Sequence, residues 1–250
     1  MQQDDFIRDE LTKSISYAWD NTRATWSQHE PIVQLLSSIN DLFMKYLKVF
    51  SKLSEEATIE SSPAAFLASA YACYLASIRI SSSGQITAAF VMFRACIENA
   101  LYGYYIDKHP ELGVIWAERH KNKKAEKLVR KNFYISDIFK SLKSQDPKVG
   151  PGIEDMYDKS IDYGAHPNVY SIGLNLLDTD DGQKINFEIF NTDTCILKYC
   201  LLANARFGLG CLSVFRLIYP EELQNHGVLE ELKSLIDRLN ELSPKMKRKK

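Results

Sequence analysis

Residues 85–106, QITAAFVMFRACIENALYGYYI, form an almost entirely apolar helical run that carries two charges, Arg94 and Glu98, one helical turn apart. A charged side chain on so apolar a helix must be paired and hydrogen-bonded, because an uncompensated buried charge costs several kcal/mol. Three more polar side chains share this stripe at helical spacing: Thr87, Tyr102 and Tyr105. The run predicts a core helix whose polar stripe is either a structural ion pair or the floor of a site.

Helical patterns flank this run on both sides. Apolar residues recur at helical spacing over 4–29, 32–53, 63–80, 193–218 and 223–239. The short connection SSSG at 81–84 predicts that helices 63–80 and 85–107 pack antiparallel, with 193–218 against them. VYSIGLNLL and QKINFEIF alternate around an Asp-Gly turn, which predicts a β-hairpin. We expect a mainly α protein, an antiparallel helical bundle with one inserted β-hairpin at about 169–190.

Changes in composition suggest three segments. The acidic, serine-rich stretch SEEATIESS separates an N-terminal helical extension, 1–58, from a bundle core with the hairpin, 59–240. The last residues, 241–250, include KMKRKK, which is too basic and too short to pack. We expect this tail to be disordered.

The charge balance gives no overall field to attract a polyanion or polycation, because 31 Lys and Arg face 32 Asp and Glu. The start of the chain, MQQDDFIRDELTKS, lacks the basic-then-apolar pattern of a secretory signal, so we expect a cytoplasmic protein. Segments 63–78 and 85–106 are apolar enough to raise the question of a membrane. Alanine and serine in the first and the charges of the second favour core helices and no membrane partner.

Neither a metal site nor a cofactor site is predicted. The chain has five cysteines inside apolar helical runs and no CxxC pair, which indicates reduced thiols. Phosphate loops, HExxH and GxSxG are absent from the sequence. Asp155, Asp158 and Asp162 share one helix face, but a solvated acidic face explains them better than a metal site, because Lys159 pairs naturally with Asp155.

A second group of polar residues lies in YDKSIDYGAHPN, 157–168. Pro167 disfavours helical geometry at His166, which places the imidazole just past a helix end. Asp162 and Tyr163 precede it closely and are candidates to orient the ring. A histidine beside a proline is either a satisfied structural residue or a titrating group of a site.

The segment ERHKNKKAEKLVRK, 118–131, holds seven Lys or Arg against two Glu. It is either a solvated helix face or a surface that contacts phosphate. The candidate RNA-contacting residues are Arg119, Lys121, Lys123, Lys124 and Lys127.

An apolar helix reading R-x3-E, a later helix ending S-x5-HPN, a hairpin and a long final apolar helix together resemble bacterial all-helical proteins with a HEPN-like arrangement. The likeness covers about 60–220. It implies a homodimeric cytoplasmic protein of toxin or phage-defence type that binds or cleaves RNA without metal or cofactor. The candidate catalytic residues are Arg94, Glu98 and His166, and the candidate supporting residues are Tyr157, Ser160 and Asn168 from this resemblance and Tyr102 from the polar stripe of the central helix.

The sequence departs from the family's R-x4–6-H motif, which is matched formally only by RATWSQH, 23–29, outside the expected helix. The alternative function is a non-catalytic helical interaction or scaffold module. In that case the Arg, Glu and His cluster is structural, and the N-terminal helix or the hairpin binds a partner protein or a second copy.

Overall fold

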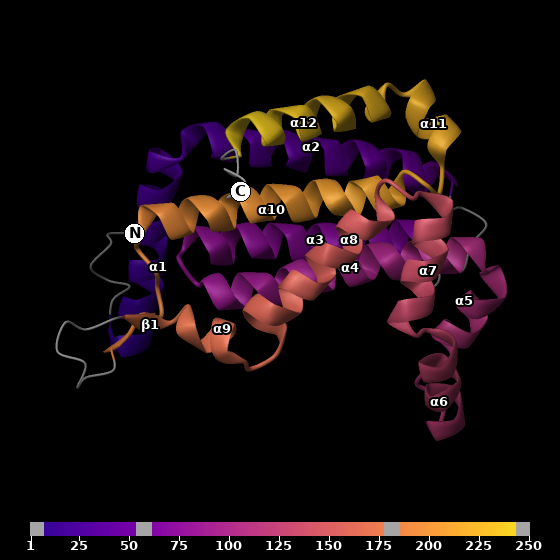
Figure 1. The fold of residues 1–250 in the computed structure, drawn as a ribbon, viewed down its shortest axis with the longest axis horizontal. Helices are drawn as coiled ribbons and strands as arrows, with labels where there is room; N and C mark the ends of the chain where they lie inside the picture. The colour runs from indigo at the N-terminus through magenta and orange to yellow at the C-terminus, as the bar shows by residue number, and fades with distance from the viewer. Residues whose placement is uncertain (1–7, 54–61, 178–185, 244–250) are drawn as a thin grey trace, which may run out of the picture.

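The computed structural model describes residues 8–53, 62–177 and 186–243, and this part of the chain is mainly helical, as predicted (Figure 1). Its first helices are α1 (Glu10–Gln28), α2 (Glu30–Leu53), α3 (Pro63–Ser82), α4 (Ile86–Lys108), α5 (Pro110–Ala117) and α6 (Lys123–Asn132). They are followed by α7 (Ile135–Gln145), α8 (Gly150–Ser160), the π-helix η3 (Ile161–Ala165) and α9 (Val169–Gly173). Strands β1 (Leu176–Leu177) and β2 (Asn186–Phe187) precede α10 (Thr194–Phe215), α11 (Pro220–Asn225) and α12 (Val228–Leu242).

Helices α3, α4 and α10 form the centre of the molecule, and α2 and α12 cover α10 on one side (Figure 1). Helix α2 turns a full apolar face inward, so its side chains belong to the same hydrophobic core as those of α4 and α10. The boundary predicted at residue 58 falls between two helices of this core. Residues 54–61 around that boundary lie outside the described ranges.

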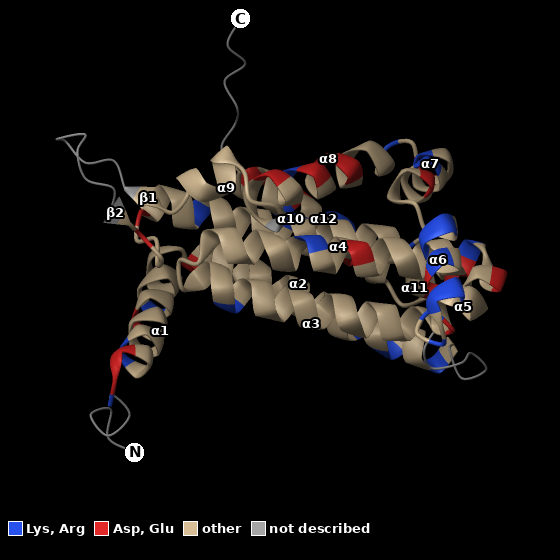
Figure 2. Ribbon diagram, turned by 90° about the horizontal axis from the view of Figure 1, so that it is seen from below, with Lys and Arg blue, Asp and Glu red and all other residues tan. Residues whose placement is uncertain are grey.

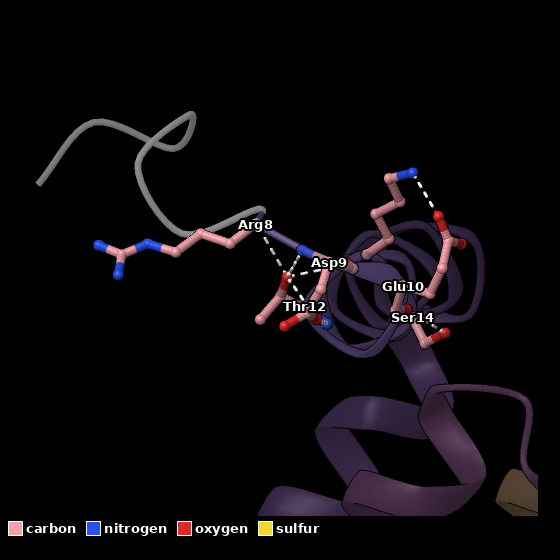
Figure 3. A network of polar contacts seen from close by, with 6 residues as sticks. Arg8, Asp9, Glu10, Thr12 and Ser14 are labelled. Atoms are coloured by element: carbon pink, nitrogen blue, oxygen red, sulfur yellow. Dashed lines mark hydrogen bonds and ion pairs between the residues drawn. The ribbon is translucent and has the colours of Figure 1, made fainter.

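Helix α1 starts with a reciprocal cap (Figure 3). The backbone N–H of Thr12 donates to Asp9 Oδ1 at 2.8 Å, and the backbone N–H of Asp9 donates to Thr12 Oγ1 at 3.0 Å. Two of the N–H groups that a helix start leaves open are thereby satisfied, which stabilises the first turn. The helix then lies across the end of the bundle where α3 passes into α4 (Figure 1).

The β-hairpin predicted over 169–190 is not supported. Asn168 Oδ1 accepts from the backbone N–H groups of Tyr170 and Ser171, and this capping box starts helix α9 where the first strand was expected. The described residues of the segment keep only a two-residue antiparallel ladder, in which Leu176 pairs with Phe187. The expected Asp-Gly turn lies outside the described residues.

The C-terminal tail predicted from 241 begins inside regular structure, because α12 runs to Leu242. The leucines of α12 bury one face of this helix against α2 and α10. The helix therefore continues past residue 240, the expected limit of the core. The basic residues 244–250 lie outside the described part of the chain.

Two of the described helices, α3 and α10, have the length and composition that could span a membrane, each with a mean hydropathy of 1.3. Helix α10 is 67% buried over this window, whereas α3 is 33% buried. The other candidate from the sequence, 85–106, does not meet this measure. Core helices of soluble proteins have the same length and composition.

Helix α10 packs closely on α3 because Gly208 has no side chain. A Cβ atom at Gly208 would lie 2.6 Å from Cε2 of Tyr74. Tyr74 is 1% exposed and its hydroxyl donates to the backbone O of Leu36, so its ring has little freedom to move away. One turn earlier, Asn204 bridges Ser77 and Ser81 of α3 inside the apolar core.

We predict that Gly208→Ala lowers the free energy of unfolding by about 1–3 kcal/mol, because the added methyl group overpacks the contact with Tyr74. Gly152→Ala is the matched control, since a Cβ atom there meets nothing within 4 Å. The control should be neutral or stabilise by up to about 1 kcal/mol. Urea unfolding measures both, and equal stability of the two variants would contradict the packing described for α10.

Candidate functional site

The candidate site lies where η3 meets α4. Helix α8 passes into a π-helical turn over Ile161–Ala165, a local irregularity that is frequent at functional sites. Gly164 lets the backbone of this turn approach α4, because a Cβ atom there would lie 2.4 Å from Thr87 O and 2.6 Å from Phe90 Cβ. Beyond the turn, His166 is extended, with φ −135° and ψ 141°, as Pro167 predicts.

Arg94 of α4 is the hub of the site. Its Nε donates to Glu98 Oε1 at 2.8 Å, and its Nη2 donates to the hydroxyl of Tyr157 at 3.1 Å. The hydroxyl of Tyr157 in turn donates to Glu98 Oε1 at 3.2 Å, which closes a triangle of three side chains. The guanidinium also lies over the Tyr157 ring, 5.3 Å from its centroid.

His166 joins this triangle from the surface. Its Nε2 lies 3.3 Å from Arg94 Nη1, although the two residues are 72 positions apart. Because a guanidinium only donates, Nε2 can accept from Arg94 only in the tautomer that carries its proton on Nδ1. The backbone O of His166 accepts from Asn168 Nδ2 at 3.0 Å and from Ser171 Oγ at 3.1 Å, which fixes the loop that carries the ring.

The electrostatics of the triangle keep Arg94 charged and Tyr157 neutral. Burial acts to lower the pKa of Arg94, but the hydrogen bond and the charge of Glu98 outweigh it, so the pKa is raised. Burial, followed by the charge of Glu98, raises the pKa of Tyr157. The Arg94 side chain is still 26% exposed, so the cation remains in reach of solvent.

The predicted supporting residues lie in different surroundings. Tyr102 stacks on Phe133 with ring centroids 5.2 Å apart, and burial, then the charge of Glu98, raises its pKa. Ser160 is fully buried and donates to the backbone O of Tyr157 at 2.6 Å, so it stabilises the helix end. Asn168 caps α9 and holds the His166 loop.

Of the predicted basic residues, only Arg119 interacts with a residue of this site. Arg119 is half-buried, and its charge acts on Tyr102 to lower the pKa of that phenol. Lys121 pairs with Glu118 at 3.0 Å. Lys123, Lys124 and Lys127 are exposed on α6, which projects from the end of the bundle and packs on α5 (Figures 1 and 2).

Three aromatic residues, Phe90, Tyr163 and Tyr170, form a cluster near His166 in the chain and on α4, and of these only Tyr163 was predicted as part of a site. The ring of Phe90, one turn before Arg94 on α4, lies 5.3 Å from that of Tyr163. Tyr163 was expected to orient His166, but it packs on Phe90 and lies 6.0 Å from the ring of Tyr170. Tyr170 is 64% exposed. The sequence signal for Phe90 was its position four residues before Arg94, which places both side chains on the same face of the helix.

The outer face of α8 is acidic (Figure 2). Burial first, and then the like charges of Glu154, Asp162 and Asp155, raise the pKa of Asp158. Asp155 pairs with Lys159 at 2.6 Å, as expected. The like charges on this face disfavour the approach of an anion to it.

The described residues contain no group of three or more His, Cys, Asp or Glu side chains that could hold a metal ion. No family model, curated protein or solved structure matches this chain.

We predict that Glu98→Ala and Tyr157→Phe are coupled in stability, because each removes a partner of the hydrogen bond from the Tyr157 hydroxyl to Glu98 Oε1. A double-mutant cycle in urea should give a coupling free energy of about 0.5–1.5 kcal/mol. The exposed pair Asp155 and Lys159 is the control and should give no more than about 0.5 kcal/mol. Equal coupling in the two cycles would mean that the triangle is no stronger than a surface pair.

Proposed function

We propose that the chain is a HEPN-like RNA-binding protein that cleaves single-stranded RNA without a metal ion, with Arg94 and His166 as its catalytic pair. The observation that carries the proposal is the distance of 3.3 Å between Arg94 Nη1 and His166 Nε2 at a solvent-reachable position. Metal-independent cleavage of RNA needs a cation for the phosphate and a base for the 2′-hydroxyl. These two side chains are such groups.

Arg94 has donors left for a phosphate. Its hydrogen bonds to Glu98, Tyr157 and His166 engage three of the five N–H groups of a guanidinium. Glu98 and Tyr157 act as positioning residues, since they hold the guanidinium and keep it charged. A phosphate oxygen that takes the donor at Nη1 would also release Nε2 of His166.

The released imidazole is the general base. Nε2 takes the proton of the 2′-hydroxyl, the 2′ oxygen bonds to phosphorus, and the bond from phosphorus to the 5′ oxygen breaks. The products are a 2′,3′-cyclic phosphate and a 5′ alcohol, whose oxygen takes a proton from water, and the imidazolium then gives its proton to the hydroxide that remains. The charge that builds on the phosphate oxygens is stabilised by Arg94.

Single-stranded RNA is the substrate class that fits the surroundings. Exposed aromatic rings stack on unpaired bases, and Tyr163 and Tyr170 offer such rings beside His166. At the other end of the stripe, Tyr102 of α4 lies near Arg119 in the turn after α5, whose charge acts to lower the pKa of the phenol. The exposed Lys123, Lys124 and Lys127 of α6 are the proposed contacts for the phosphate backbone of the RNA.

The resemblance in sequence adds the wider setting of the proposal. It supports a cytoplasmic homodimer of bacterial toxin or phage-defence type. The second candidate, a non-catalytic interaction module, is favoured by the exposed apolar side chains near β1 and β2. Val169 is 84%, Phe187 70% and Ile189 66% exposed. In that case the Arg94 cluster is a structural polar network that holds η3 against α4.

We predict that His166→Ala and Arg94→Gln each lower the rate of cleavage of a labelled single-stranded RNA by about 100-fold or more. EDTA should leave the rate of the unmodified protein unchanged. The controls are His226→Ala and Arg206→Gln, which remove an exposed histidine and an exposed arginine on α11–α12 and α10. Gel analysis of the products measures the rate, and thermal unfolding checks the fold.

Absence of cleavage by the unmodified protein, or full activity of the folded His166→Ala variant, would contradict the catalytic assignment. If Arg94→Gln and His166→Ala both unfold the protein and no RNA is cut, the cluster is structural and the second candidate stands.

We also predict that Tyr170→Ala weakens binding of a short single-stranded RNA about tenfold, because one base loses its stacking surface, worth about 1–3 kcal/mol. Tyr199→Ala is the matched control, since Tyr199 is 59% exposed on α10. Fluorescence anisotropy measures both dissociation constants. An equal loss for the two variants would show that the rings beside His166 do not hold bases.

A further inference from the structure

A groove of about 760 Å³ lies between α1 and α3, away from the Arg94 cluster. Apolar side chains line most of it: Leu11, Ile15, Trp19, Trp26, Ala76 and Ile80. The two indole rings remain open to solvent, with Trp19 50% and Trp26 44% exposed. The volume lies in the range of about 300–1,000 Å³ that is typical of small-molecule sites.

Hydrogen bonds at its inner end hold the groove open in this form. Asn21 Nδ2 donates to the backbone O of Ser83 at 2.8 Å and to that of Asn191 at 3.1 Å. Trp26 Nε1 donates to Ser82 Oγ at 2.8 Å. The contacts of Asn21 with Ser83 and of Trp26 with Ser82 fix α1 relative to α3. A preformed groove loses little conformational entropy when a ligand enters.

One cation at the groove has no anionic partner among the residues that the structure describes. The guanidinium of Arg79 lies 5.6 Å from the centroid of the Trp19 ring, and no carboxylate of the described residues lies within ion-pair distance of it. The other lining arginine, Arg23, is paired with Asp20 at 3.2 Å. An apolar groove with one open guanidinium is complementary to a molecule with an apolar body and one negative charge.

We propose that this groove binds a small amphipathic acid. Its aliphatic or aromatic body lies between α1 and α3 against Trp19 and Trp26, and its carboxylate pairs with Arg79. Arginine suits this role because its planar fork matches the two oxygens of a carboxylate. The site is separate from the Arg94 cluster and does not depend on the proposed cleavage of RNA.

Decanoate and decanol, which share an apolar chain and differ in charge, test the proposal by equilibrium dialysis and tryptophan fluorescence. The unmodified protein should bind decanoate at least tenfold more tightly than decanol. Arg79→Gln should remove most of this difference, whereas Arg206→Gln, an exposed arginine on α10 outside the groove, should keep it. Equal affinity for the two probes, or a full preference in Arg79→Gln, would overturn the assignment of the head group.

Ala18→Phe tests the location, because the added ring fills the groove from α1. It should abolish binding of both probes while circular dichroism and thermal unfolding stay unchanged. Retained binding would place the ligand elsewhere and overturn the proposal. Failure of the unmodified protein to bind either probe, together with a dimer that Ala18→Phe dissociates, would assign the groove to a second copy of the chain instead.

Discussion

The arrangement of the site depends on one guanidinium on an apolar helix. The Arg94 side chain is only 26% exposed and lies beside the buried Phe93 and Ile97 on α4, so its charge and its N–H groups need partners close by. Glu98 supplies the charge from the same helix, and Tyr157 brings α8 to it from the other side. The requirement to satisfy Arg94 therefore ties α8 to α4, and the chain that follows α8 must pass beside the cluster.

The π-turn η3 uses this constraint to bring a second polar group to the hub. Gly164 lies against Thr87 and Phe90, which sets the distance between the turn and α4, and Asn168 closes the loop behind it. His166 is held between these two points with its Nε2 facing Arg94. A structural polar network alone would be complete with Glu98 and Tyr157. The exposed His166 is an additional group, and its imidazole is capable of acid–base chemistry.

Part of the site is predictable from the sequence, because it follows from strong local rules. Charges on an apolar helix have to meet polar partners, and Pro167 keeps His166 extended, so the meeting of Arg94 with His166 was predictable. The hairpin is not supported over its predicted extent, because the capping box at Asn168 outweighs the β-propensity of the residues after it and only Leu176 and Leu177 pair with β2. The sequence predicts a helix over 4–29 from its apolar spacing, but only tertiary contacts determine that the stripe of α1 with Leu11 lines an open groove against α3.

The most direct measurement of the central claim is proton–carbon NMR of the histidine rings during titration with a short single-stranded RNA whose 2′-hydroxyls are methylated to prevent cleavage. The His166 signals are assigned by comparison with His166→Gln. If Arg94 and His166 receive the phosphate, the His166 signals shift and saturate with the RNA, while those of His226, bonded to Glu222 O on α11, stay in place. An RNA complex that leaves the His166 signals unmoved would contradict the account.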